Sequence, residues 1–509
     1  MELNTHICNQ LIEKGNAFTQ ITVDDDYIVR DNKPDVVRII YTKGRIALED
    51  AKVGNQVVWL TGKLHFDTLY LSDDENRRLE CVSGEVPFQE KLIMDEVGEG
   101  DELFADAKIE DLSVGIINSR KLVVRGVLNL TAEARRESEN VVACAVPKEM
   151  HYEQKTKSVD MMCLTEAKKD IVRIQKELLL PNSRTNIGTI IFYQVDFRNE
   201  DVQLKSDGIQ IQMDAQVWVL YRSETTGEYE CFETVVPVMG MIESSYLVGD
   251  EIFWTKIRPM EIDLEPRGDY DGEARMLGLE VMLAVEAEIY REESCDVLLD
   301  VYSLQKELVL QKEPFELSQL LMKNISKIRI LEQAHLEPNQ EKILQICGSN
   351  GMVGIDRIQR KENGLLVEGI LQVHILYNTI EDSMPYGHSE EQIPFEQFIE
   401  IDNFSNDARF KIEIKLEQLQ VNLLDNTEYE IKAVLQMALL AEQVLQFEKI
   451  VEIEERPFNI EELQKQPGMI GCVRKEGEDL WDIAKRYHAT AENIIEIGDK
   501  VLVVKQVLS

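Results

Sequence analysis

Basic residues are scarce in this 509-residue sequence. Lys and Arg number 55 against 94 Asp and Glu, so the formal net charge is −39. Proteins that bind a nucleic-acid backbone or an anionic membrane neutralise phosphates with Lys and Arg, and this acidic balance opposes such contacts. We therefore expect neither a nucleic acid nor a membrane to be the partner of the main body of the chain.

Long apolar runs are also missing. No segment approaches the roughly 18–20 apolar residues that a membrane-spanning helix needs. The first 15 residues, MELNTHICNQLIEKG, lack the basic start and the apolar core of a secretory signal. The sequence therefore predicts a cytoplasmic protein.

Cysteine is sparse and scattered. The eight cysteines include no C-x-x-C pair, so they predict reduced thiols in the core rather than a disulfide framework or a zinc site. The seven histidines form no cluster in sequence, and neither a G-x-x-x-x-G-K-[ST] loop nor a G-x-S-x-G elbow occurs. We expect no catalytic residues, no metal and no cofactor, and hence a protein that is not an enzyme.

What the sequence does contain is a threefold repeat. Each copy opens on a glycine turn, alternates apolar and polar residues, and closes on Leu-Tyr. The copies are GNQVVWLTGKLHFDTLYLS (54–72), DGIQIQMDAQVWVLYRS (207–223) and NGLLVEGILQVHILYNT (363–379). Alternation of period two, rich in Val, Ile and aromatic residues, is typical of a strand with one buried face.

The spacing around these segments is nearly constant. A proline follows each repeated tyrosine at distances of 17, 16 and 17 residues, in the pairs Tyr70 and Pro87, Tyr221 and Pro237, and Tyr377 and Pro394. The tyrosines themselves recur after 151 and 156 residues, which fits tandem domains rather than a solenoid. We therefore predict three β-rich domains of sandwich or barrel type, with little helix beyond short lead-ins such as ELSQLLMKN (316–324).

A small domain follows the repeats. Gly468 to Ser509 carries six Lys and Arg against seven Asp and Glu, so it is nearly neutral beside a strongly acidic body. The predicted division is into β domains at 1–150, 151–305 and 306–450, a linker at 451–467, and a tail domain at 468–509.

The tail is predicted to fold as strand, helix, helix and strand. DLWDIAKRY places apolar residues at i, i+3, i+4 and i+7 of a helix, with Asp479 as its N-cap and Gly477 in the preceding turn. TAENIIEI (490–497) predicts the second helix, and strands are expected at 468–473 and 500–505.

These motifs resemble known families. The triple repeat is similar to the SPOCS-domain proteins of spore-forming bacteria, and the tail resembles a LysM domain, whose usual pattern is V-x-x-G-D-T-L-W-x-I-A-x-x-Y. The combination resembles the SipL family of spore-coat morphogenetic proteins. This resemblance implies a β-rich protein with a small α+β LysM domain, a role in coat assembly at the forespore surface on the mother-cell side, and a scaffold ATPase of the coat as the partner of the tail.

The tail departs from the LysM pattern in the two loops that hold the N-acetyl groups of a glycan. Gly477-Glu478-Asp479 replaces Gly-Asp-Thr, and the loop after the second helix is cut to IGDK (497–500). A LysM scaffold with this altered groove can still offer a surface to a protein. The candidate partner-binding residues are Val473, Gly477, Trp481, Lys485 and His488.

Alternatives remain open at this point. Trp481 can instead cover the small tail core while Lys485 is solvated. The tail can also bind glycan, as wall-binding LysM domains do, or target a peptidoglycan hydrolase whose catalytic residues the motifs do not reveal. An adaptor that binds a protein through its tail is the function that the sequence favours.

Overall fold

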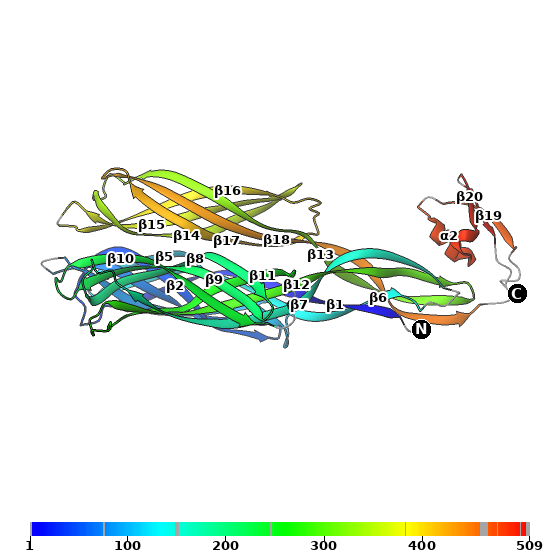
Figure 1. Cartoon of the computed structure of the whole chain (residues 1–509), viewed down its shortest axis with the longest axis horizontal. Coiled ribbons are helices and arrows are strands. Elements are labelled where there is room, and N and C mark those ends of the chain that lie inside the picture. Colours follow the sequence, from blue (N-terminus) through cyan, green and yellow to red (C-terminus); the bar gives the residue numbers. More distant parts are fainter. Residues whose placement is uncertain are drawn as a thin grey trace.

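The computed structural model describes residues 3–74, 77–147, 152–244, 247, 249–381, 383–458, 467–475, 477–498 and 500–504. The described part is mainly β, as the sequence predicts, and it holds one α-helix, which lies in the tail. Figure 1 shows an elongated molecule with a broad head, a narrower stalk, and the tail at the far end of the stalk.

The strands before the tail come in three sets of six. The first set is β1 (Asn4–Ile28), β2 (Val36–Gly54), β3 (Val57–Ser72), β4 (Leu79–Ile93), β5 (Glu102–Asn118) and β6 (Lys121–Ala145). The second is β7 (Tyr152–Leu179), β8 (Ile187–Lys205), β9 (Gly208–Ser223), β10 (Tyr229–Glu243), β11 (Ile252–Arg267) and β12 (Met276–Ser303). The third is β13 (Lys306–His335), β14 (Ile343–Lys361), β15 (Gly364–Thr379), β16 (Tyr386–Glu400), β17 (Arg409–Leu423) and β18 (Glu428–Pro457). We call these sets the first, second and third repeats.

Each repeat consists of two antiparallel three-stranded sheets. In the first repeat the strand orders are β1-β6-β5 and β2-β3-β4, and the equivalent strands have the same orders in the other two repeats. The apolar faces of the two sheets pack together, for example Leu60 and Phe66 of β3 with Val124 and Leu128 of β6. This packing accounts for the alternation of apolar and polar residues in the sequence, because successive side chains of a strand point to opposite faces of the sheet.

The repeated tyrosine and proline share one hairpin in every repeat. Tyr70 of β3 pairs with Glu80, and Pro87 of β4 pairs with Lys63, so the 17-residue spacing reflects an uninterrupted antiparallel register. The proline lies on the edge strand of its sheet, where its missing N–H costs no ladder hydrogen bond.

The stalk is built from the longest strands. The outer ends of β1 and β6, β7 and β12, and β13 and β18 continue past the head as three antiparallel pairs, at about residues 4–12, 136–145, 152–164, 290–303, 306–319 and 443–457. Side chains from all three repeats meet along its axis, including Val142 of the first, Val297 of the second and Leu317 of the third. Figure 1 shows these strands leaving the head together.

Two predictions for the repeats are wrong in detail. Residues 316–324 lie within β13 instead of a short helix. Leu317 is buried in the stalk and pairs with Leu445 of β18, so tertiary pairing overrides the helical spacing of the local leucines. The first seven residues of the predicted 451–467 linker continue β18, where Ile453 pairs with Leu310, and 459–466 lie outside the described residues.

The tail contains β19 (Met469–Val473), α2 (Leu480–Tyr487), a 3-10 helix (Ala491–Asn493), β20 (Ile494–Ile497) and β21 (Lys500–Val504). Its sheet has the order β19-β21-β20. The predicted second helix at 490–497 is therefore wrong, since one 3-10 turn leads straight into β20. Three β-branched isoleucines in four residues favour a strand, and β21 supplies the hydrogen-bonding partner.

Candidate partner-binding tail

The start of α2 is defined by its capping residues. The Asp479 carboxylate accepts the N–H of Asp482 at 2.9 Å, and the Asp482 carboxylate accepts the N–H of Asp479 at 3.0 Å. This reciprocal capping satisfies two backbone donors that the first turn of a helix leaves without partners. Gly477 has φ +82°, a left-handed conformation that glycine adopts without strain. The predicted N-cap and turn are thus confirmed.

The apolar side of α2 packs on the tail sheet. Ile483 is fully buried against Val501 and Val503 of β21, and Tyr487 and Ile470 pack at the margin of this cluster. Within the tail, α2 therefore packs through one face. Its other side, which carries Trp481 and Lys485, faces the tip of the stalk.

Trp481 and Lys485 both bind Asp300 of β12. The Trp481 indole Nε1 donates to Asp300 Oδ2 at 2.8 Å, and Lys485 Nζ contacts the two carboxylate oxygens at 2.6 and 2.8 Å. The Trp481 ring also packs edge-to-face on Tyr302, with ring centroids 4.9 Å apart. One acidic side chain of the second repeat thus engages the cation and the aromatic residue that the sequence nominates for a partner.

Three further contacts join the tail to the stalk. His488 Nδ1 lies 3.2 Å from the Ser303 carbonyl oxygen, and the Tyr302 hydroxyl donates to the Ala489 carbonyl at 2.7 Å. Lys155 of β7 donates to the Asp479 carboxylate at 2.6 Å. We call Lys155, Asp300, Tyr302 and Ser303 the stalk tip. These contacts orient the tail on the second repeat.

The contacts at this junction favour the ionised forms of Asp300, Asp479 and Lys155. Burial acts to raise the pKa of Asp300, but the hydrogen bonds from Lys485 and Trp481 outweigh it, so the pKa lies below its ordinary value. The hydrogen bond from Lys155 lowers the pKa of Asp479, and the same bond raises the pKa of Lys155.

The structure places the candidate partner-binding residues in three different parts of the tail. Trp481, Lys485 and His488 gather at the stalk tip, while Gly477 lies in the turn before α2. Val473 is 62% exposed and projects from the face of the sheet that turns away from α2, as do Met469 and Ile495. We call Met469, Val473 and Ile495 the outer sheet face.

The stalk tip is the part of this arrangement that sequence reasoning missed. Asp300 is 181 residues from Trp481, and Tyr302 is 187 residues from Ala489. Asp300 lies in a run of ordinary strand residues, so no local signal marks it as the acceptor for the tail.

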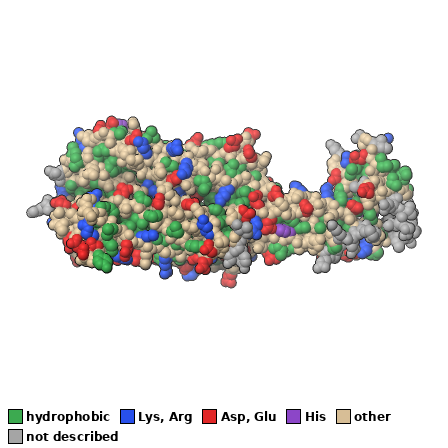
Figure 2. All heavy atoms as spheres, in the orientation of Figure 1, with side chains coloured by type: hydrophobic (Ala, Val, Ile, Leu, Met, Phe, Trp, Pro, Cys, Tyr) green, Lys and Arg blue, Asp and Glu red, His purple; other side chains and the backbone are tan. Residues whose placement is uncertain are grey.

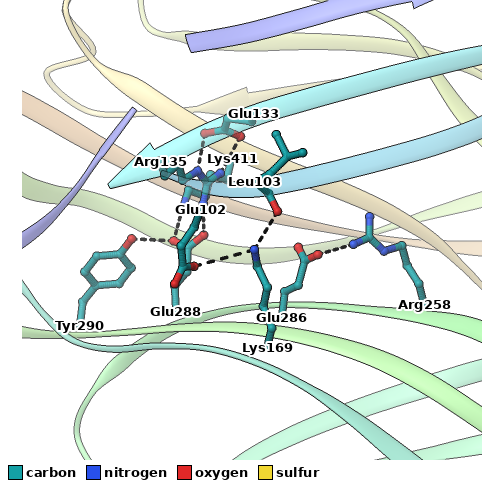
Figure 3. Close-up of polar contacts among 10 residues, drawn as sticks. All are labelled: Glu102, Leu103, Glu133, Arg135, Lys169, Arg258, Glu286, Glu288, Tyr290 and Lys411. Carbon is teal, nitrogen blue, oxygen red and sulfur yellow. Dashed lines mark hydrogen bonds and ion pairs between the residues drawn. The ribbon is translucent and has the colours of Figure 1, made fainter. Parts of the chain in front are cut away.

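A second group of buried charges holds the three repeats together where the head meets the stalk (Figure 3). Glu288 of the second repeat is 5% exposed and forms ion pairs with Arg135 of the first repeat and Lys411 of the third. Tyr290 donates a further hydrogen bond to the same carboxylate at 2.6 Å. Burial acts to raise the pKa of Glu288, but Lys411 and Arg135 lower it below its ordinary value.

Among the described residues, His6, Cys163 and Glu293 bring three possible metal-ligand atoms within 4.8 Å of one another. His6 Nε2 already lies 2.8 Å from the Glu293 carboxylate. The hydrogen bond with Cys8, together with burial, raises the pKa of the Cys163 thiol, which disfavours the thiolate that a metal requires. We assign no metal to this group.

Comparison with known proteins supports part of the family prediction. The family described as SipL, SPOCS domain matches residues 35–117 and 342–424. These two segments take up the equivalent strands β2–β5 and β14–β17. The fold is thus that of a β-rich protein, and parts of its first and third repeats are similar to the SPOCS domain.

The two matches support the SipL-like family that the sequence resembles. No curated protein and no solved structure matches the chain. Within the described residues, none of the helices is both long enough and apolar enough to cross a membrane.

Proposed function

We propose that this chain is a non-enzymatic adaptor in spore-coat assembly. Its LysM-like tail binds the scaffold ATPase of the coat at the forespore surface, on the mother-cell side. The two SPOCS matches support the link to the coat. The main support for this proposal is the position of the tail. The tail lies at the end of the stalk, away from the head, where a partner can reach it (Figure 1).

The three repeats suit the role of a stiff support. Glu288 joins all three repeats in one buried ion network, and the stalk packs three hydrogen-bonded strand pairs around a common apolar core. Figure 2 shows acidic and basic side chains interspersed over the visible face of the head. A surface of this kind stays soluble while the tail carries the specific contact.

The outer sheet face is the part of the tail that we assign to the partner. Trp481, Lys485 and His488 are engaged by the stalk tip, so they set the orientation of the tail. Met469, Val473 and Ile495 are 59%, 62% and 50% exposed on one face of a small sheet. Exposed apolar residues grouped in this way are typical of a protein-binding surface.

Co-purification with the purified scaffold ATPase tests the proposal. Removing residues 468–509 is expected to abolish binding, and Val473→Glu is expected to weaken it at least tenfold while the tail stays folded. Val235→Glu is the matched control, because Val235 is a 57% exposed valine on a strand of the head. Undiminished binding without the tail would refute its role.

Three other results would favour a different binding surface or a different function. If Asp300→Ala strengthens binding while Val473→Glu leaves it unchanged, the partner contacts the Trp481 side in competition with the stalk tip. Saturable micromolar binding of chito-oligosaccharides would favour the glycan-binding alternative, and muralytic activity of the repeats would establish a hydrolase.

A further inference from the structure

Four of the eight cysteines meet in the stalk, although they are scattered in the sequence. Cys8 and Cys144 belong to the first repeat, and Cys163 and Cys295 belong to the second. All four lie in one apolar cluster with neighbours such as Val159. The eight cysteines are free thiols.

Two pairs of thiols in this cluster are in contact, Cys8 with Cys163 and Cys144 with Cys295. The Sγ atoms of Cys144 on β6 and Cys295 on β12 are 2.8 Å apart, and the two residues are separated by 151 positions in the sequence. β6 and β12 belong to different sheets, so no backbone ladder dictates this meeting. An S–S bond is about 2.05 Å long, so less than about 1 Å of side-chain movement separates the two thiols from bonding distance.

Ordinary core packing does not explain the arrangement fully. Cysteine often serves as a small apolar residue, and Cys472 has this role in the tail core. Cys144 and Cys295 differ from Cys472 because their sulfurs face each other across the boundary between two repeats. Here a thiol of the first repeat meets a thiol of the second, and in the described part of the chain β6 and β12 belong to separate sheets.

We propose that Cys144 and Cys295 are a site of oxidative modification, at which a hydroperoxide converts the two thiols into a disulfide that links the first and second repeats. Cys144 loses its proton, and its thiolate attacks one peroxide oxygen. The O–O bond breaks, and the leaving hydroxide takes up that proton as water, so that Cys144 becomes a sulfenic acid. Cys295 then attacks the Cys144 sulfur, the S–S bond forms, and the departing hydroxide takes up the Cys295 proton as water. Two thiols and one hydrogen peroxide thus give one disulfide and two waters.

The surroundings set the order of these two steps. Cys144 is partly exposed, so peroxide reaches it first, while Cys295 is 7% exposed. Burial and the contact with Cys144 raise the pKa of Cys295 to about 12. Cys295 therefore stays a thiol until the sulfenic acid forms beside it.

The test uses the full-length protein. Reduced protein is treated with hydrogen peroxide, quenched with catalase, alkylated and digested without reductant, and the peptides are identified by mass spectrometry. A linked peptide pair containing Cys144 and Cys295 is expected. The melting temperature should rise by several degrees over that of reduced protein, because the crosslink closes a loop of about 150 residues in the unfolded chain.

Two serine variants provide the matched comparison. Cys144→Ser should lose the linked pair and the rise in melting temperature, and Cys472→Ser should keep both. The linked peptide pair is detected in the wild-type protein, so the proposal can still be tested if a serine variant fails to fold. Separately alkylated Cys144 and Cys295 after treatment, a link formed only between Cys8 and Cys163, or a disulfide between two chains would each overturn the proposal.

Discussion

The indole of Trp481 donates a hydrogen bond to the carboxylate of Asp300 at 2.8 Å, and this contact ties the tail to the second repeat. Lys485 binds the same carboxylate. The aromatic residue and the cation nominated for a partner are thereby satisfied within the chain, which leaves the outer sheet face of the tail open.

Replacing Asp300 with Ala should release the tail from the stalk tip. The variant loses the bonds from Trp481 and Lys485, and hydrogen bonds to a charged group contribute about 1.5–3 kcal/mol each. Hydrogen exchange should therefore speed up in residues 477–490 and 300–303 and stay unchanged in the head. Asp296→Ala, an exposed residue of the same strand, is the control. Equal exchange in both variants would contradict the docking role of Asp300.

Glu288→Gln should destabilise the junction of the three repeats. The substitution leaves Arg135 and Lys411 facing a neutral amide, and breaking a buried ion pair typically costs about 3–5 kcal/mol. Denaturant unfolding of the full chain measures the loss. Glu292→Gln, which changes an exposed glutamate of the same strand, should have little effect. A similar midpoint for the two variants would show that the ion network contributes little.

The repeated tyrosines should differ in what their hydroxyls contribute. The Tyr221 hydroxyl donates to the Glu230 carboxylate at 2.8 Å and lies 3.2 Å from the Thr185 carbonyl oxygen. The buried Tyr377 hydroxyl has no hydrogen-bond partner among the described residues. Tyr221→Phe should therefore cost about 1–3 kcal/mol, whereas Tyr377→Phe should be close to neutral. Thermal unfolding of the two variants compares them directly, and equal losses would contradict this difference.

The head should lose stability in mild acid because of two histidines. His374 and His388 of the third repeat stack with their ring nitrogens 3.2 Å apart, and both rings pack near Tyr41 of the first repeat. Burial lowers the pKa of both, and that of His388 falls to about 4, with further lowering from His374 and an opposing effect of Glu390.

As the pH falls, the two histidines are therefore protonated in the unfolded chain before they are protonated in the folded chain. The free energy of unfolding is highest above about pH 6.5 and decreases as the pH drops towards 4. Unfolding measured across this range should show the decline, and His388→Gln should reduce it. A variant with the same pH profile as the wild type would rule out this pair as the cause.

Local sequence specifies the strands of the repeated hairpins, the threefold repetition and the start of α2. Alternating apolar residues, the constant spacing of Tyr70 and Pro87 with their counterparts, and the capping aspartate Asp479 are local signals, and each acts within one hairpin or one helical turn. These signals suffice because side-chain periodicity and capping depend on neighbours along the chain.

The remaining features depend on contacts between segments that are far apart in the sequence. Residues 316–324 are a strand because β18 supplies their hydrogen bonds, and 494–497 are a strand because β21 does. Trp481 meets Asp300, and Cys144 meets Cys295, because three pairs of long strands pack into one stalk. Contacts between residues 150 or more positions apart leave no periodic trace in the sequence, and only the packing of whole repeats brings them together.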